Sequence, residues 1–261
     1  MQSKNLIYQF WNGTMPHYAL RSSELMQRYA NCVGADYKLS FNEHFFSWIT
    51  NPFTRRYEQY FNALRPIYDP WFAQYESVLF VDMDVYPGVL QEDIFSLEVY
   101  SDFDIAMAEE AEQPDQRIYR RGPINSVNDK KYAEVIERRF QASPPKMPDG
   151  RLKIFNSGVV LYRNLRSLRA YVPKPDNYIA SIKLAGLPRF YCLDQNFLGA
   201  IIGTSKVRFF PLDEAWNFRV RNGADPSTEY NFLHLQLTGK ESWSKQTTEQ
   251  IIQKLPLANF N

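Results

Sequence analysis

The sequence predicts an α/β fold in which a mostly parallel central sheet is flanked by helices. The first observation is a strand-like, a helix-like and a second strand-like segment in succession over residues 5–39, an order that favours a parallel strand pair. The second is the apolar run 78–81, which has the composition of a buried strand and leads into carboxylates. The third is size: 261 residues suit one large domain or two small ones, and we expect a single domain over 1–261.

The composition indicates which partners and which cellular compartment to expect. The net charge of +1 creates no strong field for nucleic acid or for an anionic membrane, and we expect neither as a partner. No run of about 18 apolar residues occurs, so no membrane span is predicted. Cys32 and Cys192 lie far apart, which disfavours a disulfide, and residues 1–4 lead into an apolar run unlike a secretory leader. The expectation is a soluble, cytoplasmic protein.

The first half of the chain alternates apolar segments with turn signals. Residues 5–11 are rich in strand formers and end at the turn pair Asn12-Gly13. Residues 22–30 carry an apolar stripe at helical spacing, and residues 36–39 suit a second strand. A helix is expected at 55–64, and Pro66 and Pro70 break the helical pattern after it. A short helical piece at 71–75 and a strand at 105–108 are expected next.

The second half begins with a segment of different character. Residues 109–150 are charged and rich in proline, with one expected helix at about 129–140. This segment is either a mobile insertion over a cleft or a plain solvated loop. Strands are then expected at 154–162, 207–210 and 232–237, and helices at 194–202 and at about 248–255.

Asp82 and Asp84 directly follow the apolar run Val78–Val81. Side chains alternate along a strand, so a continued strand would place both carboxylates on one face. Open α/β sheets bind ligands at the carboxyl edge of their strands, and paired carboxylates there suit a divalent cation shared with phosphate oxygens. The alternative is a pair of capping aspartates. A second copy, Asp102-Phe103-Asp104, follows no apolar run and is interpreted as the lead-in to the next strand.

Two later motifs add uncharged and acidic groups. Asn156 and Ser157 offer an amide and a hydroxyl that suit sugar hydroxyls, and Gly158 permits close approach of a ligand or of backbone. A polar turn entering a strand is the alternative. Asp194 and Gln195 open a helix, where an aspartate often serves only as a cap.

The last motif lies near the end of the chain. His234 occupies an apolar strand, where a histidine is more often a satisfied core residue than a ligand, and Lys240 follows six residues later. The four motifs in this order resemble the landmarks of GT-A-fold glycosyltransferases, chiefly the glycogenin-like family eight. Those enzymes combine a strand ending in Asp-x-Asp, a Phe-Asn-Ser-Gly-Val strand, an Asp-Gln helix start and a His-x-x-Gly-x-x-Lys-Pro-Trp segment. The resemblance extends from about residue 60 to residue 243. The chain resembles a divergent branch of the family, of microbial or viral type.

The resemblance implies a role for each matching position. Asp82, Asp84 and His234 would ligate Mn²⁺ or Mg²⁺, and the imidazole favours Mn²⁺. Asp194 and Gln195 would be the catalytic residues beside the anomeric carbon. Lys240 would reach the diphosphate, Asn156 and Ser157 the donor sugar, and Arg65 the nucleotide, with the base at the end of the first strand. The implied cofactor-binding residues are Tyr8, Gln9, Asn12, Arg65, Asp82, Asn156, Ser157 and Lys240.

The implied activity is transfer of a sugar from a nucleotide-sugar donor, in the first place a UDP-sugar, to a hydroxyl acceptor such as a glycan. Residues 1–110 would form the nucleotide-binding half and 111–261 the acceptor-side half, with a flexible insertion at 109–150. Retention and inversion both stay open, because Asp194, Glu109 or Glu110 would serve as the base of an inverting enzyme. The chain departs from the family in its first strand and in Lys240-Glu-Ser-Trp243, where the family has Lys-Pro-Trp.

Two other function classes compete with a transferase. In a phosphohydrolase, Asp82 would attack phosphate and Asp84 would act as the acid, although such a pair usually comes near the N-terminus. In a non-catalytic module, the same residues would bind a sugar nucleotide or a carbohydrate without turnover. The full set of Asp82, Asp84, His234 and Lys240 argues for the enzyme.

Overall fold

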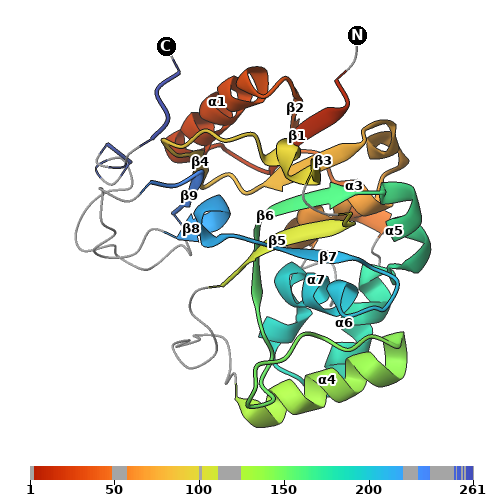
Figure 1. Ribbon diagram of the computed structural model, residues 1–261. Helices are drawn as coiled ribbons and strands as arrows, with labels where there is room; N and C mark the ends of the chain where they lie inside the picture. The colour runs from red at the N-terminus through yellow and green to blue at the C-terminus, as the bar shows by residue number, and fades with distance from the viewer. Residues whose placement is uncertain are drawn as a thin grey trace.

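The computed structural model describes residues 3–48, 58–99, 102–110, 125–219 and 229–235, together with 250, 252, 253, 255 and 257–260. A six-stranded sheet in the order β2-β1-β3-β6-β5-β7 forms its centre (Figure 1). The strands are β1 (Asn5–Trp11), β2 (Asp36–Phe41), β3 (Ser77–Val81), β5 (Ile105–Glu109), β6 (Phe155–Arg163) and β7 (Phe209–Leu212). β1 runs parallel to β2 and β3, and β5 runs parallel to β7, whereas β6 is antiparallel to both β3 and β5. The predicted α/β class with a mostly parallel sheet is therefore confirmed.

Helices cover both faces of this sheet. They are α1 (His17–Cys32), α3 (Arg65–Tyr68), α4 (Ser126–Phe140), α5 (Leu165–Tyr171), α6 (Pro175–Leu184) and α7 (Asp194–Ile202). Alternation along the strands gives each face its own core. On β3, Val78 and Phe80 pack with α4, α6 and α7, whereas Leu79 and Val81 pack on the side of α1. Figure 1 shows α1 on one side of the sheet and α4, α6 and α7 on the other.

A second, small sheet lies beside α1 (Figure 1). It has the order β4-β9-β8, with β4 (Val85–Pro87), β9 (Phe232–His234) and β8 (Phe218–Arg219). β9 pairs antiparallel with β4 and parallel with β8. Because β4 begins directly after Asp84, this sheet brings a late segment of the chain next to the end of β3.

Several elements differ in extent from the prediction. β1 and α7 have the expected bounds, and α4 begins earlier than residue 129. The described part of the expected helix at 55–64 is a 3₁₀-helix, Glu58–Leu64. Pro66 does not end a helix but lies in the first turn of α3, where the missing N–H costs no hydrogen bond. The strand expected at 207–210 is β7. It includes Pro211, and this proline is tolerated because β7 is an edge strand.

Two further expectations concern the thiols and the membrane. Cys32 is exposed and Cys192 is buried, and both are free. Within the described ranges, no helix combines the length and apolar character that crossing a bilayer requires.

Candidate metal centre

Asp82 and Asp84 come together through a turn rather than through strand alternation. Every residue of β3 is buried, and the strand ends at Val81. The next residues form a tight turn in which the Val85 N–H donates to the Asp82 carbonyl oxygen at 3.1 Å. The sequence-based reason for their proximity, a continued strand, was therefore wrong. The turn nevertheless leaves both side chains at the carboxyl edge of the central sheet.

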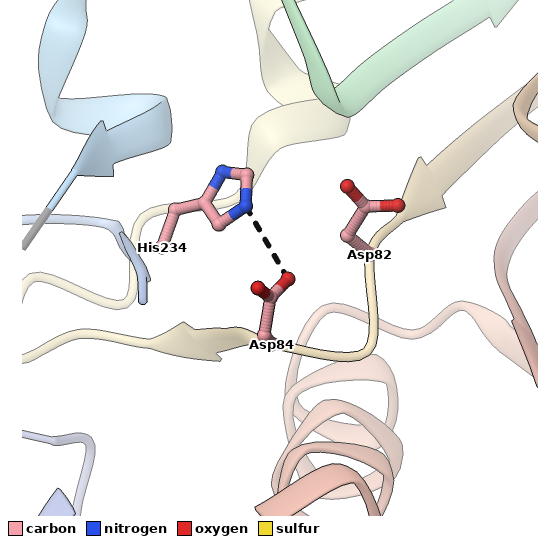
Figure 2. Close-up of side chains that lie close together, drawn as sticks. All are labelled: Asp82, Asp84 and His234. Atoms are coloured by element: carbon pink, nitrogen blue, oxygen red, sulfur yellow. Dashed lines mark ion pairs between the residues drawn. The ribbon is translucent and has the colours of Figure 1, made fainter. Parts of the chain in front are cut away.

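His234 reaches the two acids on β9. It lies opposite Val85 in the antiparallel β4–β9 pair, and only 4% of its surface is exposed. Its Nε2 lies 3.3 Å from Asp84 Oδ1. One ligand atom from each of Asp82, Asp84 and His234 lies within 4.8 Å of the other two, and Figure 2 shows the three side chains facing a common space. Such a cluster of two carboxylates and an imidazole has the donor set of a Mn²⁺ or Mg²⁺ site.

An amide relay fixes the orientation of the His234 ring. Asn217 Nδ2 donates to Asn156 Oδ1 at 2.9 Å, so the Asn217 oxygen faces His234 Nδ1, also at 2.9 Å. The Gly158 N–H donates to the same Asn156 oxygen at 2.8 Å. An acceptor at Nδ1 places the imidazole hydrogen there, and leaves the Nε2 lone pair directed toward the acids. The relay therefore selects the tautomer that can bind a metal through Nε2.

Gly158 gives the imidazole the space that it occupies. A Cβ added at Gly158 would lie 2.3 Å from His234 Cε1 and 2.7 Å from Nδ1. Side-chain atoms do not approach each other so closely, so any other residue at 158 would displace the ring. The sequence predicted a close approach at this glycine, and the group that approaches is a predicted metal ligand.

The electrostatics of the cluster favour a bound cation. Burial, and then the Asp84 carboxylate, raise the pKa of Asp82 to about 8. Burial alone would lower the pKa of His234, but attraction to the Asp84 carboxylate and a hydrogen bond that the protonated ring donates to it bring the pKa above its usual value. Two acids crowded into a partly buried site repel each other unless a positive charge lies between them. The residues present thus fit a divalent ion in chemistry as well as in spacing.

Asp194 lies near this cluster, at the first turn of α7. Its charge contributes to the raised pKa of Asp82. Burial raises the pKa of Asp194 itself to about 6, although the Ser157 hydroxyl and the Gln195 N–H partly offset that effect. The next residue, Gln195, donates from Nε2 to Glu110 Oε2 at 3.3 Å. Sequence reasoning placed Asp194, Gln195 and Ser157 in one site, and the structure brings these three together.

Glu110 is held by a buried ion pair that the sequence did not indicate. Its Oε1 lies 2.9 Å from Arg219 Nη1, and both side chains are about 5% exposed or less. Arg219 is opposite His234 in the parallel β8–β9 pair. The ion pair therefore joins the end of β5 to the small sheet and, through Gln195, to the start of α7. No local motif marks Arg219 or Asn217, because their roles arise from contacts between distant segments.

The residues expected to hold the nucleotide are less accessible than expected. Tyr8 and Gln9 lie within β1 rather than at its end, and both are fully buried. Tyr8 contacts the rings of Phe72 and Phe80 on the face opposite α1. Gln9 faces α1 and donates to the Asp82 carbonyl oxygen at 3.2 Å. β1 has the predicted bounds, but both residues lie before its last two positions and their side chains are buried, not exposed at the end of the strand where the base is expected.

The other three residues expected to contact the nucleotide or its diphosphate are Asn12, Arg65 and Lys240. Asn12 directly follows β1 and is partly buried. Arg65 is 7% exposed and forms ion pairs with Glu43 at 2.6 Å and with Asp69 at 3.1 Å. Its guanidinium is thus engaged within the protein. Lys240 lies outside the described residues.

Comparison with known proteins identifies structures of similar shape. No protein-family model and no curated protein matches the chain. It is similar to a glycosyltransferase involved in the glycosylation of the major capsid of PBCV-1, with 15% identity, a TM-score of 0.49, and coverage of 89% of this chain and 92% of that one. Mouse xyloside xylosyltransferase 1 has 14% identity and a TM-score of 0.48, with coverage of 88% of this chain and 97% of that one. The mannosyltransferase Ktr4p from S. cerevisiae has 12% identity and a TM-score of 0.46, with coverage of 80% of this chain and 68% of that one. At these values a function has to be inferred from the side chains of the site.

Proposed function

We propose that this protein is a metal-dependent glycosyltransferase that moves a sugar from a nucleotide-sugar donor, in the first place a UDP-sugar, to a hydroxyl acceptor such as a glycan. The observation that carries the proposal is the convergence of Asp82, Asp84 and His234 at the carboxyl edge of the sheet. The ordered motifs support a divergent relative of the glycogenin-like family eight with a GT-A fold. Residues 1–110 would bind the nucleotide, and the later half would bind the acceptor.

In this proposal Asp82, Asp84 and His234 hold Mn²⁺ or Mg²⁺, with Lys240 reaching the diphosphate. The cation, when bound, would neutralise charge that builds up on the leaving diphosphate, an effect worth several kcal/mol. The His234 tautomer set by Asn217 keeps Nε2 available to that ion. Burial, and then the Asp84 carboxylate, raise the pKa of Asp82, so a cation has to displace a proton from this carboxyl. Binding should therefore release a proton and strengthen as the pH rises.

The donor sugar would lie against Asn156, Ser157, Asp194 and Gln195. The Asn156 oxygen is occupied by the relay to His234, so its Nδ2, which has no hydrogen-bond partner among the described residues, is the group left for a sugar hydroxyl. Glu109 pairs with Lys153 at 2.7 Å and Glu110 pairs with Arg219. Asp194, with its pKa of about 6, is therefore the best candidate for a base if the reaction inverts the anomeric centre.

One contact of Asp84 disfavours the phosphohydrolase alternative. Asp84 would be the acid of that mechanism, but its Oδ1 lies 3.3 Å from His234 Nε2. A carboxylate held beside an imidazole suits a shared metal site better than the delivery of a proton to a leaving group.

The experiment measures nucleoside diphosphate release from a panel of nucleotide sugars with Mn²⁺. Asp84→Asn should lower kcat by about 100-fold or more, since the metal acts in the transition state. Asp102→Asn, in the second Asp-x-Asp sequence, is the matched control and should retain near-normal turnover. EDTA should abolish activity and Mn²⁺ restore it.

Each rival function has its own signature in these assays. Near-normal kcat for Asp84→Asn contradicts the metal assignment. Release of phosphate from p-nitrophenyl phosphate would identify a phosphohydrolase instead. Binding of a nucleotide sugar with Mn²⁺, but without hydrolysis or transfer, would identify a non-catalytic module.

A further inference from the structure

The turn that carries Asp82 and Asp84 is attached to two buried side chains that approach it from β1 and α1. We propose that Gln9 and Ser22 are positioning residues that hold this turn in the geometry required to bind a divalent cation. Both side chains are fully buried. The inference rests on the metal role proposed above, and assigns to Gln9 a function different from contact with the nucleotide.

The contacts of Gln9 and Ser22 are directed to backbone atoms at the two ends of the turn. Gln9 Nε2 donates to the Asp82 carbonyl oxygen at 3.2 Å and to Ser22 Oγ at 3.1 Å. Ser22 Oγ in turn donates to the Val85 carbonyl oxygen at 2.6 Å. The two side chains therefore connect the first and last residues of the segment Asp82–Val85.

The direction of each hydrogen bond in this set is determined. The Tyr37 hydroxyl donates to Gln9 Oε1 at 2.8 Å, which leaves the Gln9 nitrogen to face the turn. The Ser22 hydrogen is used on the Val85 carbonyl oxygen, so its lone pair is available to accept from Gln9. Only one orientation of the Gln9 amide satisfies all these contacts, and an interior that excludes water makes any other orientation costly.

Neighbouring segments of the chain hold two further backbone groups of the turn. The Asp82 N–H donates to the Gly158 carbonyl oxygen at 2.8 Å, and the Leu235 N–H donates to the Asp84 carbonyl oxygen at 2.9 Å. Those two contacts depend only on backbone. Substitution of Gln9 or Ser22 can therefore loosen the turn without changing Asp82, Asp84 or His234.

The experiment measures Mn²⁺ affinity by calorimetric titration and, separately, resistance to urea. Gln9→Met keeps the length of the side chain and removes its amide, and Ser22→Ala removes one hydroxyl. Outer contacts that orient metal ligands typically change affinity by about 10–100-fold. We expect a loss of about tenfold or more for Gln9→Met, a smaller loss for Ser22→Ala, and an affinity within about twofold of wild type for Ser22→Thr.

Tyr29→Phe is the matched control on the same helix. The Tyr29 hydroxyl donates to the Glu92 carbonyl oxygen at 2.6 Å and accepts from the Ile94 N–H at 3.2 Å, away from the turn. This variant should lose urea resistance but keep Mn²⁺ affinity. Wild-type affinity in both Gln9→Met and Ser22→Ala, or in Ser22→Ala alone if Gln9→Met does not fold, overturns the positioning role. An equal loss in Tyr29→Phe also overturns it. A wild-type protein that binds no Mn²⁺ overturns the proposed metal function itself.

Discussion

Burial and crowding of the acids in the candidate metal centre make a quantitative prediction about the metal-free protein. Asp82 ionises in the unfolded chain near its usual pKa of 3.8, whereas in the folded protein its pKa is raised to about 8. The folded state therefore holds the proton more tightly than the unfolded state. The contribution of Asp82 to the free energy of unfolding is therefore fully present below about pH 4 and is lost as the pH rises toward 8.

The magnitude follows from the size of the shift. One pKa unit corresponds to about 1.4 kcal/mol, so a shift from 3.8 to about 8 corresponds to about 6 kcal/mol at high pH. The Asp82 side chain is only partly buried, and solvent screening reduces this to roughly 2–4 kcal/mol. Asp82→Asn removes the ionisation, so the metal-free variant should be more stable than wild type by that amount at pH 8. The corresponding increase in Tm is roughly 5–10 °C.

The assay is urea or thermal unfolding in EDTA at pH 4.5 and at pH 8. The second Asp-x-Asp sequence supplies a control of opposite sign. Burial would raise the pKa of Asp104, but hydrogen bonds from Arg208 outweigh burial and lower it. Asp104 therefore stabilises the fold at pH values above the usual aspartate pKa. Asp104→Asn should lower the free energy of unfolding at pH 8, and this loss should become smaller as the pH falls.

Adding Mn²⁺ should reverse the order of stability of the wild type and Asp82→Asn. A ligand at a thousandfold excess over Kd stabilises the folded state by about 4.1 kcal/mol, which exceeds the stability difference worked out above, and only the wild type keeps the full ligand set. The reasoning is refuted if metal-free Asp82→Asn is less stable than wild type at pH 8. A difference between the two proteins that does not change from pH 4.5 to pH 8 would refute it as well.

Two further substitutions test the packing around the site. Gly158→Ala should cost about 1–3 kcal/mol in urea unfolding and at least tenfold in Mn²⁺ affinity, because its Cβ would displace the His234 ring. Gly199→Ala, with nothing within 4 Å of the added carbon in α7, should instead stabilise the protein by about 0.5–1 kcal/mol, and an equal loss in both variants would argue against a specific role for Gly158. Glu110→Leu removes the carboxylate that compensates the charge of the buried Arg219, so it should lower the free energy of unfolding by on the order of 3 kcal/mol. The double variant Glu110→Leu/Arg219→Met should recover most of that loss in urea unfolding. A double variant as unstable as the single one would show that the ion pair is not the cause.

The fold was largely predictable because its strongest elements carry local signals. β1 is an apolar and aromatic segment closed by Asn12-Gly13, and α7 is an apolar helix that opens with Asp194, so both have the expected bounds. Misplaced elements involve proline. Pro66 lies in the first turn of α3 and Pro211 lies on an edge strand, and whether a proline is tolerated depends on the neighbours that the fold provides.

The candidate site was predictable only where its residues belong to motifs. Asp82, Asp84 and His234 were identified from motif order, and the structure places their ligand atoms within 4.8 Å of one another. Asn217 was missed because its value lies in a contact with His234 that no sequence spacing encodes. Gln9 was interpreted as a nucleotide contact because the family resemblance places the base at the end of the first strand. Its burial beneath the turn depends on the packing of α1 against β1, which the pattern of β1 alone does not reveal.

The small sheet also determines when the candidate metal centre can form. β9 lies between β4 and β8, so His234 meets the acids only after a late segment of the chain has inserted beside an early one. During synthesis, Asp82 and Asp84 leave the ribosome long before His234. A nascent chain therefore carries the two acids without their imidazole and should capture cations poorly. A chain cut before residue 232 would keep all six strands of the central sheet and still lack a complete metal site.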